Sequence, residues 1–161
     1  MTDVLAVLQE FRAEKLALLV RHEAGARSMG QYDVNNTYQY IVNREEVQLS
    51  WLSAAIAELG GAVADLGVPP EATPGRGADA VRRTLDEDAA GAQAFVDRWR
   101  PRVEGMDHAR HARMLRLILG ETLEQKRFFE QALAGRTDLL GRRAAQPDAA
   151  SGDVLSSRWI E

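Results

Sequence analysis

Four long segments of the chain place apolar residues at spacings of three and four, and this periodicity constrains the fold most strongly. The segments run from about Asp3 to Ala24, Val34 to Leu59, Ala78 to Arg100 and Asp107 to Ala134. Such spacings put side chains on one face of an α-helix. No segment alternates apolar and polar residues in the manner of a β-strand, so we expect no sheet. The pattern predicts an all-α protein, an antiparallel four-helix bundle.

The connection between the second and third segments, GGAVADLGVPPEATPGRG, is long enough to cross the whole bundle. Helices of about 25 residues span roughly 37 Å at 1.5 Å per residue. About eighteen extended residues can cover that length at ~3.3 Å each. We therefore predict a long crossover between helices two and three, as in a ferritin-like bundle. The alternative is a surface loop on a simple up-and-down bundle.

The composition limits the classes of function. There is no cysteine, which excludes disulfides, iron–sulfur clusters and thiol catalysis and fits a cytoplasmic protein. The net charge of −4 argues against nucleic-acid binding. The longest apolar run, LALLV, is far shorter than the ~20 residues needed to cross a membrane. The N-terminus has no basic leader, so we expect no signal peptide.

The chain changes character after Gly135. We predict one bundle domain over residues 1–135, followed by a tail over residues 136–161 that packs on the bundle or on a partner chain. The tail ends in an apolar tip with Trp159 and Ile160, which can dock on another chain. We expect a homodimer, with no nucleic-acid or membrane partner.

Each predicted helix carries an acid near its middle, on the same face as its apolar residues. These acids are Glu14, Glu45, Asp88 (or its neighbour Glu87) and Glu121. Glu14 precedes Glu45 by 31 residues and Asp88 precedes Glu121 by 33, so the two helical hairpins share one layout. Pairing the hairpins would bring four acids to one level of the bundle.

Helices two and four add a second polar residue, Gln48 and Glu124, three positions after the acid. A spacing of three places both side chains on the same side of a helix, about one turn apart. Helices one and three therefore carry one acid each, and helices two and four each carry an acid followed three residues later by a second polar group.

This layout resembles that of the ferritin-like superfamily of di-iron carboxylate proteins, such as the rubrerythrins. Those proteins carry one Glu on each of two helices and Glu-x-x-His on the other two. The stretch REEVQLSWLSAAIAELGG also looks like the second helix of small bacterial ferritin-like domains. The resemblance covers roughly residues 3 to 134.

The resemblance implies a site for two iron or manganese ions. Glu45 and Glu121 would bridge the metals, and Glu14, Asp88 and Glu124 would be terminal ligands. Paired metals with open coordination positions activate O₂ or peroxide. The implied function is that of a di-metal carboxylate redox or metal-handling protein; no residue is assigned a catalytic role.

The chain departs from the family pattern where the two histidines belong. Gln48 and Glu124 stand there, and an amide oxygen is a poorer ligand for iron than a neutral imidazole. The alternative is therefore a ferritin-like bundle that has lost its metal site, binds no metal and serves as a binding or interaction module.

Buried acids must in either case be neutralised, because an unpaired carboxylate out of water costs several kcal/mol. Metal ions, protonation or basic neighbours can do so, and some of these acids can instead face solvent if the helical phase is one residue out. The nearby bases in the sequence are Lys15, Arg44, Lys126 and Arg127.

Overall fold

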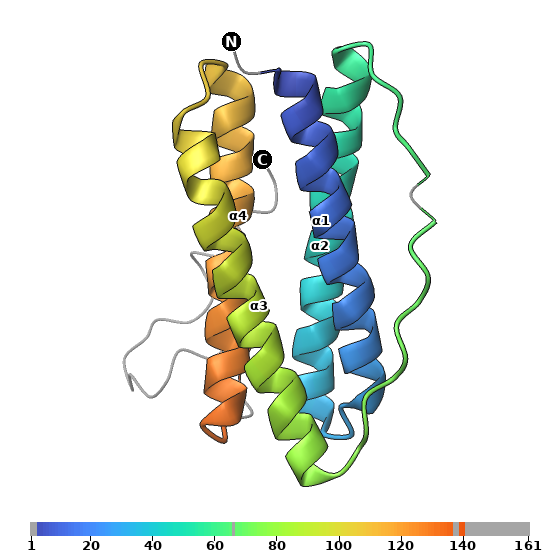
Figure 1. Ribbon diagram of the computed structural model, residues 1–161. Coiled ribbons are helices and arrows are strands. Elements are labelled where there is room, and N and C mark those ends of the chain that lie inside the picture. Colours follow the sequence, from blue (N-terminus) through green and yellow to red (C-terminus); the bar gives the residue numbers. More distant parts are fainter. Residues whose placement is uncertain (1–2, 66, 137–138, 141–161) are drawn as a thin grey trace, which may run out of the picture.

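Four helices make up the fold of this protein in a computed structural model, which describes residues 3–65, 67–136 and 139–140. They are α1 (Val4–Ser28), α2 (Tyr32–Glu58), α3 (Ala78–Glu104) and α4 (Ala109–Leu133). No strand occurs among the described residues. The helices stand side by side as a bundle, with α1 packed mainly on α2 and α3 mainly on α4 (Figure 1). The predicted all-α four-helix bundle is confirmed.

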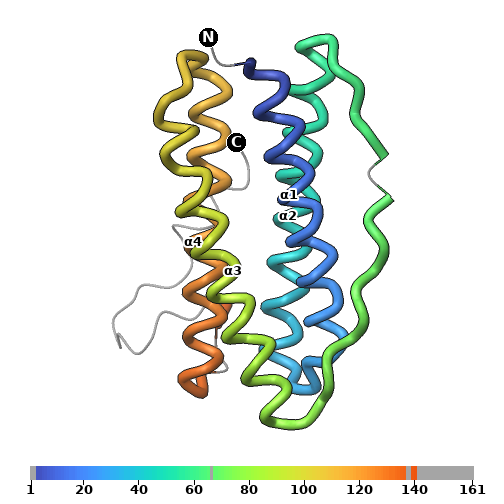
Figure 2. Tube along the Cα trace, in the orientation of Figure 1, coloured from blue at the N-terminus to red at the C-terminus, as the bar shows by residue number. Residues whose placement is uncertain are grey.

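The connection between α2 and α3 runs the whole length of the bundle, as Figure 2 shows. It is held against α1 at both ends. Near the start of α1, the Arg12 guanidinium donates to the Ala64 carbonyl at 3.1 Å. Near its end, Arg27 donates to the Glu71 carbonyl and the Thr73 hydroxyl at 3.1 and 3.0 Å. The crossover therefore brings α3 to the opposite end of the bundle, so that α2 and α3 point the same way (Figure 1).

Local signals explain where the helices start and stop. The Asp3 carboxylate caps α1 by accepting from the backbone N–H groups of Leu5 and Ala6. Gly60 and Gly135 follow α2 and α4 with φ values of 77° and 87°, which glycine adopts without steric cost. In α2 the N-cap is Gln31, and Asp33 lies in the first turn.

Helix α3 continues beyond Pro101, near which the sequence predicts its end. A proline removes one N–H from the helix but leaves its own carbonyl free to accept. The Gly105 N–H donates to the Pro101 carbonyl at 3.2 Å. The extra turn also buries Val103 completely, beside the fully buried Trp99. Burial of this apolar side chain outweighs the loss of one hydrogen bond.

The core is apolar at one end and mixed at its centre. At the apolar end Phe11 of α1 packs edge-on against Phe95 and Trp99 of α3, with ring centroids 5.1 and 4.9 Å apart. Such aromatic pairs contribute about 0.5–1.5 kcal/mol each beyond their buried area. They fix the α1–α3 contact on which the polar centre of the bundle depends.

The buried face of α4 lies one residue later than the sequence predicts. The sequence places Met114, Leu117, Ile118 and Phe128 on one apolar face of this helix; in the structure Ile118 is buried as expected, but so are Leu115 and Phe129, and Leu117 is 53% exposed. Both stripes are apolar, so periodicity alone does not separate them. Of the residues expected inside, Leu117 lies on the outside, and Met114 and Phe128 are only partly buried.

Two further expectations concern membrane-spanning helices and the C-terminal tail. No helix in the described part of the chain is long and apolar enough to cross a membrane. The predicted tail and its apolar tip lie outside the described residues, apart from Arg136, Leu139 and Leu140, of which Leu139 is buried.

Gly25, the one glycine of α1, lies where a larger residue does not fit. A Cβ there would lie 2.9 Å from Cε1 of the buried Tyr38 and 3.4 Å from Oδ2 of Asp88. We expect Gly25→Ala to lower the free energy of unfolding by about 1–3 kcal/mol, as overpacking does. Urea denaturation measures this. The control is Gly91→Ala in α3, where a Cβ meets nothing within 4 Å and a gain of about 0.5–1 kcal/mol is expected. Equal effects at both positions would contradict the packing argument.

Candidate functional site

Glu45 sits at the centre of the bundle with both carboxylate oxygens occupied. Its Oε1 accepts from Lys15 Nζ at 3.2 Å, and its Oε2 lies 2.8 Å from Nδ1 of His22. The Lys15 ammonium also donates to the Thr122 hydroxyl at 3.3 Å. All four residues are at most 1% exposed. The charge of Glu45 is therefore neutralised by two basic side chains of α1.

The environment of Glu45 keeps it ionised. Burial alone would raise the pKa of this carboxyl, because it penalises the charged form. The charges of His22 and Lys15, together with their hydrogen bonds, outweigh burial and hold the pKa of Glu45 below its usual value. A buried carboxylate of this kind needs its partners, since removing one leaves an uncompensated charge.

Asp88 forms a second buried cluster, with partners from α1 and α2. It accepts from the Tyr38 hydroxyl at 2.6 Å and from Arg21 Nε at 2.7 Å. Arg21 also donates to Glu87 at 2.8 Å. Burial, followed by the negative charge of Asp88, strongly raises the pKa of Tyr38, so its hydroxyl remains a donor at neutral pH. Of the two acids left open by the sequence, Asp88 faces the core and Glu87 the surface.

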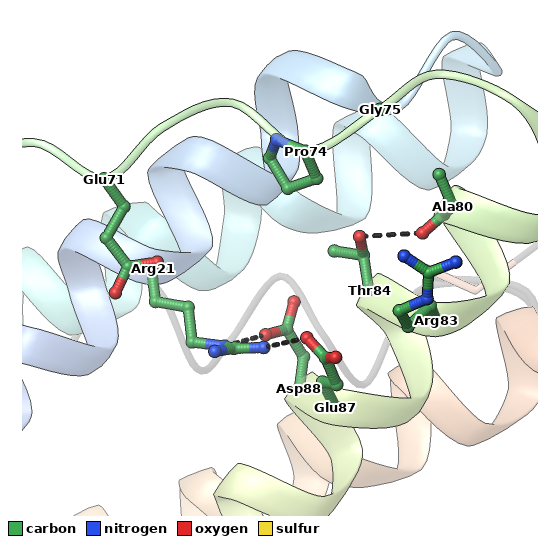
Figure 3. A pocket seen from close by; sticks show the side chains of 9 residues that line it. All are labelled: Arg21, Glu71, Pro74, Gly75, Ala80, Arg83, Thr84, Glu87 and Asp88. Carbon is green, nitrogen blue, oxygen red and sulfur yellow. Dashed lines mark hydrogen bonds and ion pairs between the residues drawn. The ribbon is translucent and has the colours of Figure 1, made fainter.

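The Asp88 cluster borders a small cavity of about 230 Å³ beneath the crossover. Figure 3 shows Arg21 reaching across it from α1 to Glu87 and Asp88 on α3. Pro74 and Gly75 of the crossover lie over it. The cavity is lined by charges of both signs, and of its two arginines, Arg21 and Arg83, the first is already engaged by two acids.

The remaining predicted acids each have partners of their own. Glu121 accepts from Arg44 Nη2 at 2.5 Å and also from the Gln48 amide. Glu14 accepts from the Trp99 indole N–H at 2.7 Å and pairs with Arg98 at 2.6 Å. Both acids are only partly buried.

Glu124 is placed differently from the other four predicted ligands. It is exposed on the outer side of α4, while its neighbour Gln125 is buried in the core. This follows from the one-residue difference in the phase of α4. Glu124 forms no hydrogen bond or ion pair with any residue that the structure describes.

The donor set at the centre does not fit the predicted pair of iron or manganese ions. Bridging requires carboxylate oxygens of Glu45 and Glu121 directed at shared metals, whereas here the first is bound to Lys15 and His22 and the second to Arg44 and Gln48. Among the described residues, no three His, Asp or Glu side chains are grouped so that they could hold a metal ion. The metal site remains a prediction from the sequence pattern.

The sequence provided the bases but not their partners. Lys15 lies beside Glu14 in sequence but binds Glu45, and Arg44 binds Glu121 rather than its neighbour Glu45. The contribution of His22 was missed. It lies seven residues after Lys15, on the same face of α1, and this spacing is the signal that could have revealed it.

Three buried side-chain atoms have no hydrogen-bond partner within the part of the chain described. They are His22 Nε2, Gln48 Oε1 and Gln125 Oε1. All three belong to residues that face the polar centre from α1, α2 and α4. Buried polar atoms usually find a partner, so these three are the atoms of the centre with unused capacity to bind.

No protein-family model matches this chain, and neither the curated proteins nor the solved structures contain a match to it.

Removing the positive charge of Lys15 should destabilise the fold strongly. We expect Lys15→Met to lower the free energy of unfolding by about 3–5 kcal/mol, because it breaks a buried ion pair and strands Glu45. Adding Glu45→Gln should recover much of the loss. Lys126→Met is the control: this lysine is partly exposed, and its pair with Glu130 should contribute less than about 1 kcal/mol. Urea denaturation of the four proteins gives these values. A loss at Lys15 no larger than at Lys126 would contradict a role in neutralising Glu45.

Glu45 should also set part of the acid sensitivity of the fold. A carboxyl whose pKa is lower in the folded than in the unfolded state stabilises the fold at any pH above its unfolded-state pKa. This stabilisation is lost as the pH falls through its folded-state pKa. We expect Glu45→Gln to be less stable at pH 7 but to lose less stability between about pH 5 and pH 3 than the natural protein does. Thermal unfolding across that range measures the difference. The exposed Glu46→Gln should follow the natural curve; parallel curves for all three proteins would rule the effect out.

Proposed function

We propose that this chain is a ferritin-like bundle that has lost its metal site and acts as a binding or interaction module. The observation that carries the proposal is the pairing of Glu45 with Lys15 and His22. An ammonium group beside the central carboxylate supplies the positive charge that metals supply in di-iron proteins. Lysine and arginine partners of this kind repel a bound cation.

The long crossover supports the ferritin-like part of the proposal. A single long crossover distinguishes ferritin-like bundles from simple up-and-down ones. The absence of cysteine fits the cytoplasm, where we place the protein.

An apolar cavity supports the binding part. It has a volume of about 430 Å³ and lies where the α1–α2 connection, the start of α3 and the end of α4 meet. Its apolar lining includes Met29, Val34, Val81, Leu85 and Leu133. Its size falls in the range of ordinary ligand pockets, about 300–1,000 Å³. An apolar group of a ligand or of another chain would fill it.

The second candidate is the di-metal redox or metal-handling protein. Its support is the set of unpartnered atoms, since His22 Nε2 and the amide oxygens of Gln48 and Gln125 are potential metal ligands at the centre. Binding there would require Lys15 to leave Glu45 or lose its proton, which makes this candidate the weaker one.

Metal analysis separates the two candidates. The full chain, produced with added iron and manganese and purified without chelator, should contain less than about a tenth of an equivalent of either metal. A bound metal stabilises the folded state, so its removal by a chelator would lower the melting temperature. If the protein binds no metal, a chelator should leave its melting temperature unchanged. About two equivalents of metal that are absent from a Glu45→Gln, Glu121→Gln double variant would overturn the proposal in favour of the di-metal candidate.

A further inference from the structure

The outer face of α4 presents apolar side chains to solvent along its seam with α2. Leu117 is 53% exposed, and Tyr40 and Val47 of α2 are 40% and 38% exposed. Met114 and Phe128 line the same seam and are partly buried. We call these five residues, together with Gly120, the Leu117 face. A cluster of exposed apolar residues on a helical bundle marks an interaction surface more often than isolated apolar residues do.

The charges on this face are arranged symmetrically about Leu117 but with opposite sign. Arg113 lies four residues before Leu117 and Glu121 four residues after it. Arg110 and Glu124 lie seven residues before and after. Separations of four and seven residues place all these side chains on one side of the helix. On α4 itself the first half of the face is therefore basic and the second half acidic, while α2 adds Glu58 beside Arg110 and Arg44 beside Glu121.

We infer that the Leu117 face binds a second copy of this chain, with the two α4 helices antiparallel about a two-fold axis at Leu117. A two-fold interface brings each residue against the residue at the mirrored position. Arg113 then faces the partner's Glu121, and Arg110 faces the partner's Glu124. A parallel arrangement would place like charges together and is disfavoured.

The shape of the helix fits the same register. Met114 lies three residues before Leu117 and Gly120 three residues after it. A Cβ at Gly120 would meet nothing within 4 Å, so the surface there is open. The Met114 side chain of one copy can enter the space left at Gly120 of the other. Large and small residues at facing positions let helices approach closely.

The unpaired charges of the face support this pairing. Within the described residues, neither Arg113 nor Glu124 forms a hydrogen bond or ion pair. Arg110 pairs with Glu58 while 74% of its side chain is exposed, and Glu121 pairs with Arg44. In the dimer each free group gains an opposite charge that it then shares with α2 of the partner copy, because Arg113 faces the Glu121 that Arg44 holds and Glu124 faces the Arg110 that Glu58 holds. This inference goes beyond the proposed function and holds whether or not the centre binds metal.

Single-cysteine cross-linking tests the register directly, because the natural chain has no cysteine. Leu117→Cys should form a disulfide-linked dimer under mild oxidation, since each copy meets its own residue at the axis. Val63→Cys is the matched control; Val63 is also exposed, at 41%, but lies on the crossover. Arg110→Cys and Glu124→Cys should link to each other when mixed, and far less when each is oxidised alone.

Sedimentation equilibrium tests the dimer itself. The natural chain should be dimeric, and Leu117→Arg should raise the dissociation constant on the order of tenfold or more, while Val63→Arg leaves it unchanged. Reversing one charge, with Glu124→Arg, should weaken the dimer, and adding Arg110→Glu should restore it. The inference is overturned if the chain is monomeric at every concentration. It is equally overturned if Leu117→Cys cross-links no better than Val63→Cys.

Discussion

A single buried charge governs the centre of this bundle. Glu45 is wholly enclosed, and a carboxylate in that position is tolerated only because an ammonium and an imidazole of α1 contact its two oxygens. The requirement is mutual, since Lys15 is as deeply buried as the acid. The pairing fixes the register of α1 against α2, because sliding either helix by one turn would separate the charges. The Thr122 hydroxyl then ties α4 to the same point.

The other polar clusters join the α1–α2 hairpin to the α3–α4 hairpin in the same way. Asp88 of α3 is held by Tyr38 and Arg21, which come from α2 and α1. In the opposite direction, Glu14 of α1 is held by Trp99 of α3. A hydrophobic surface alone would allow several docking angles for the two hairpins. These directed hydrogen bonds select one of them.

Helical periodicity was enough to predict the four helices, their antiparallel pairing and the crossover, because long apolar repeats and an eighteen-residue connection leave few other folds. The acids at the centre could also be located, since a carboxylate on an apolar stripe stands out. Their partners could not be assigned, because sequence neighbours such as Glu14 and Lys15 point to different helices. The face of α4 was misplaced in part, since Leu117 was expected inside together with Ile118, and Phe128 rather than Phe129; these neighbours are equally apolar. Only the packing of the other three helices decides which of each pair is inside.

The crossover has a consequence for how the chain can be divided. It forms hydrogen bonds with α1 near its two ends and contributes little to the core. The molecule therefore consists of two helical hairpins, α1–α2 and α3–α4, joined by the crossover. The first hairpin contains both the acid and the bases of its own central pair. The second carries Asp88 and Glu121, whose partners all lie on the first. A chain cut within the crossover would therefore yield one piece that keeps its central buried ion pair, and a second piece whose acids Asp88 and Glu121 have lost their partners.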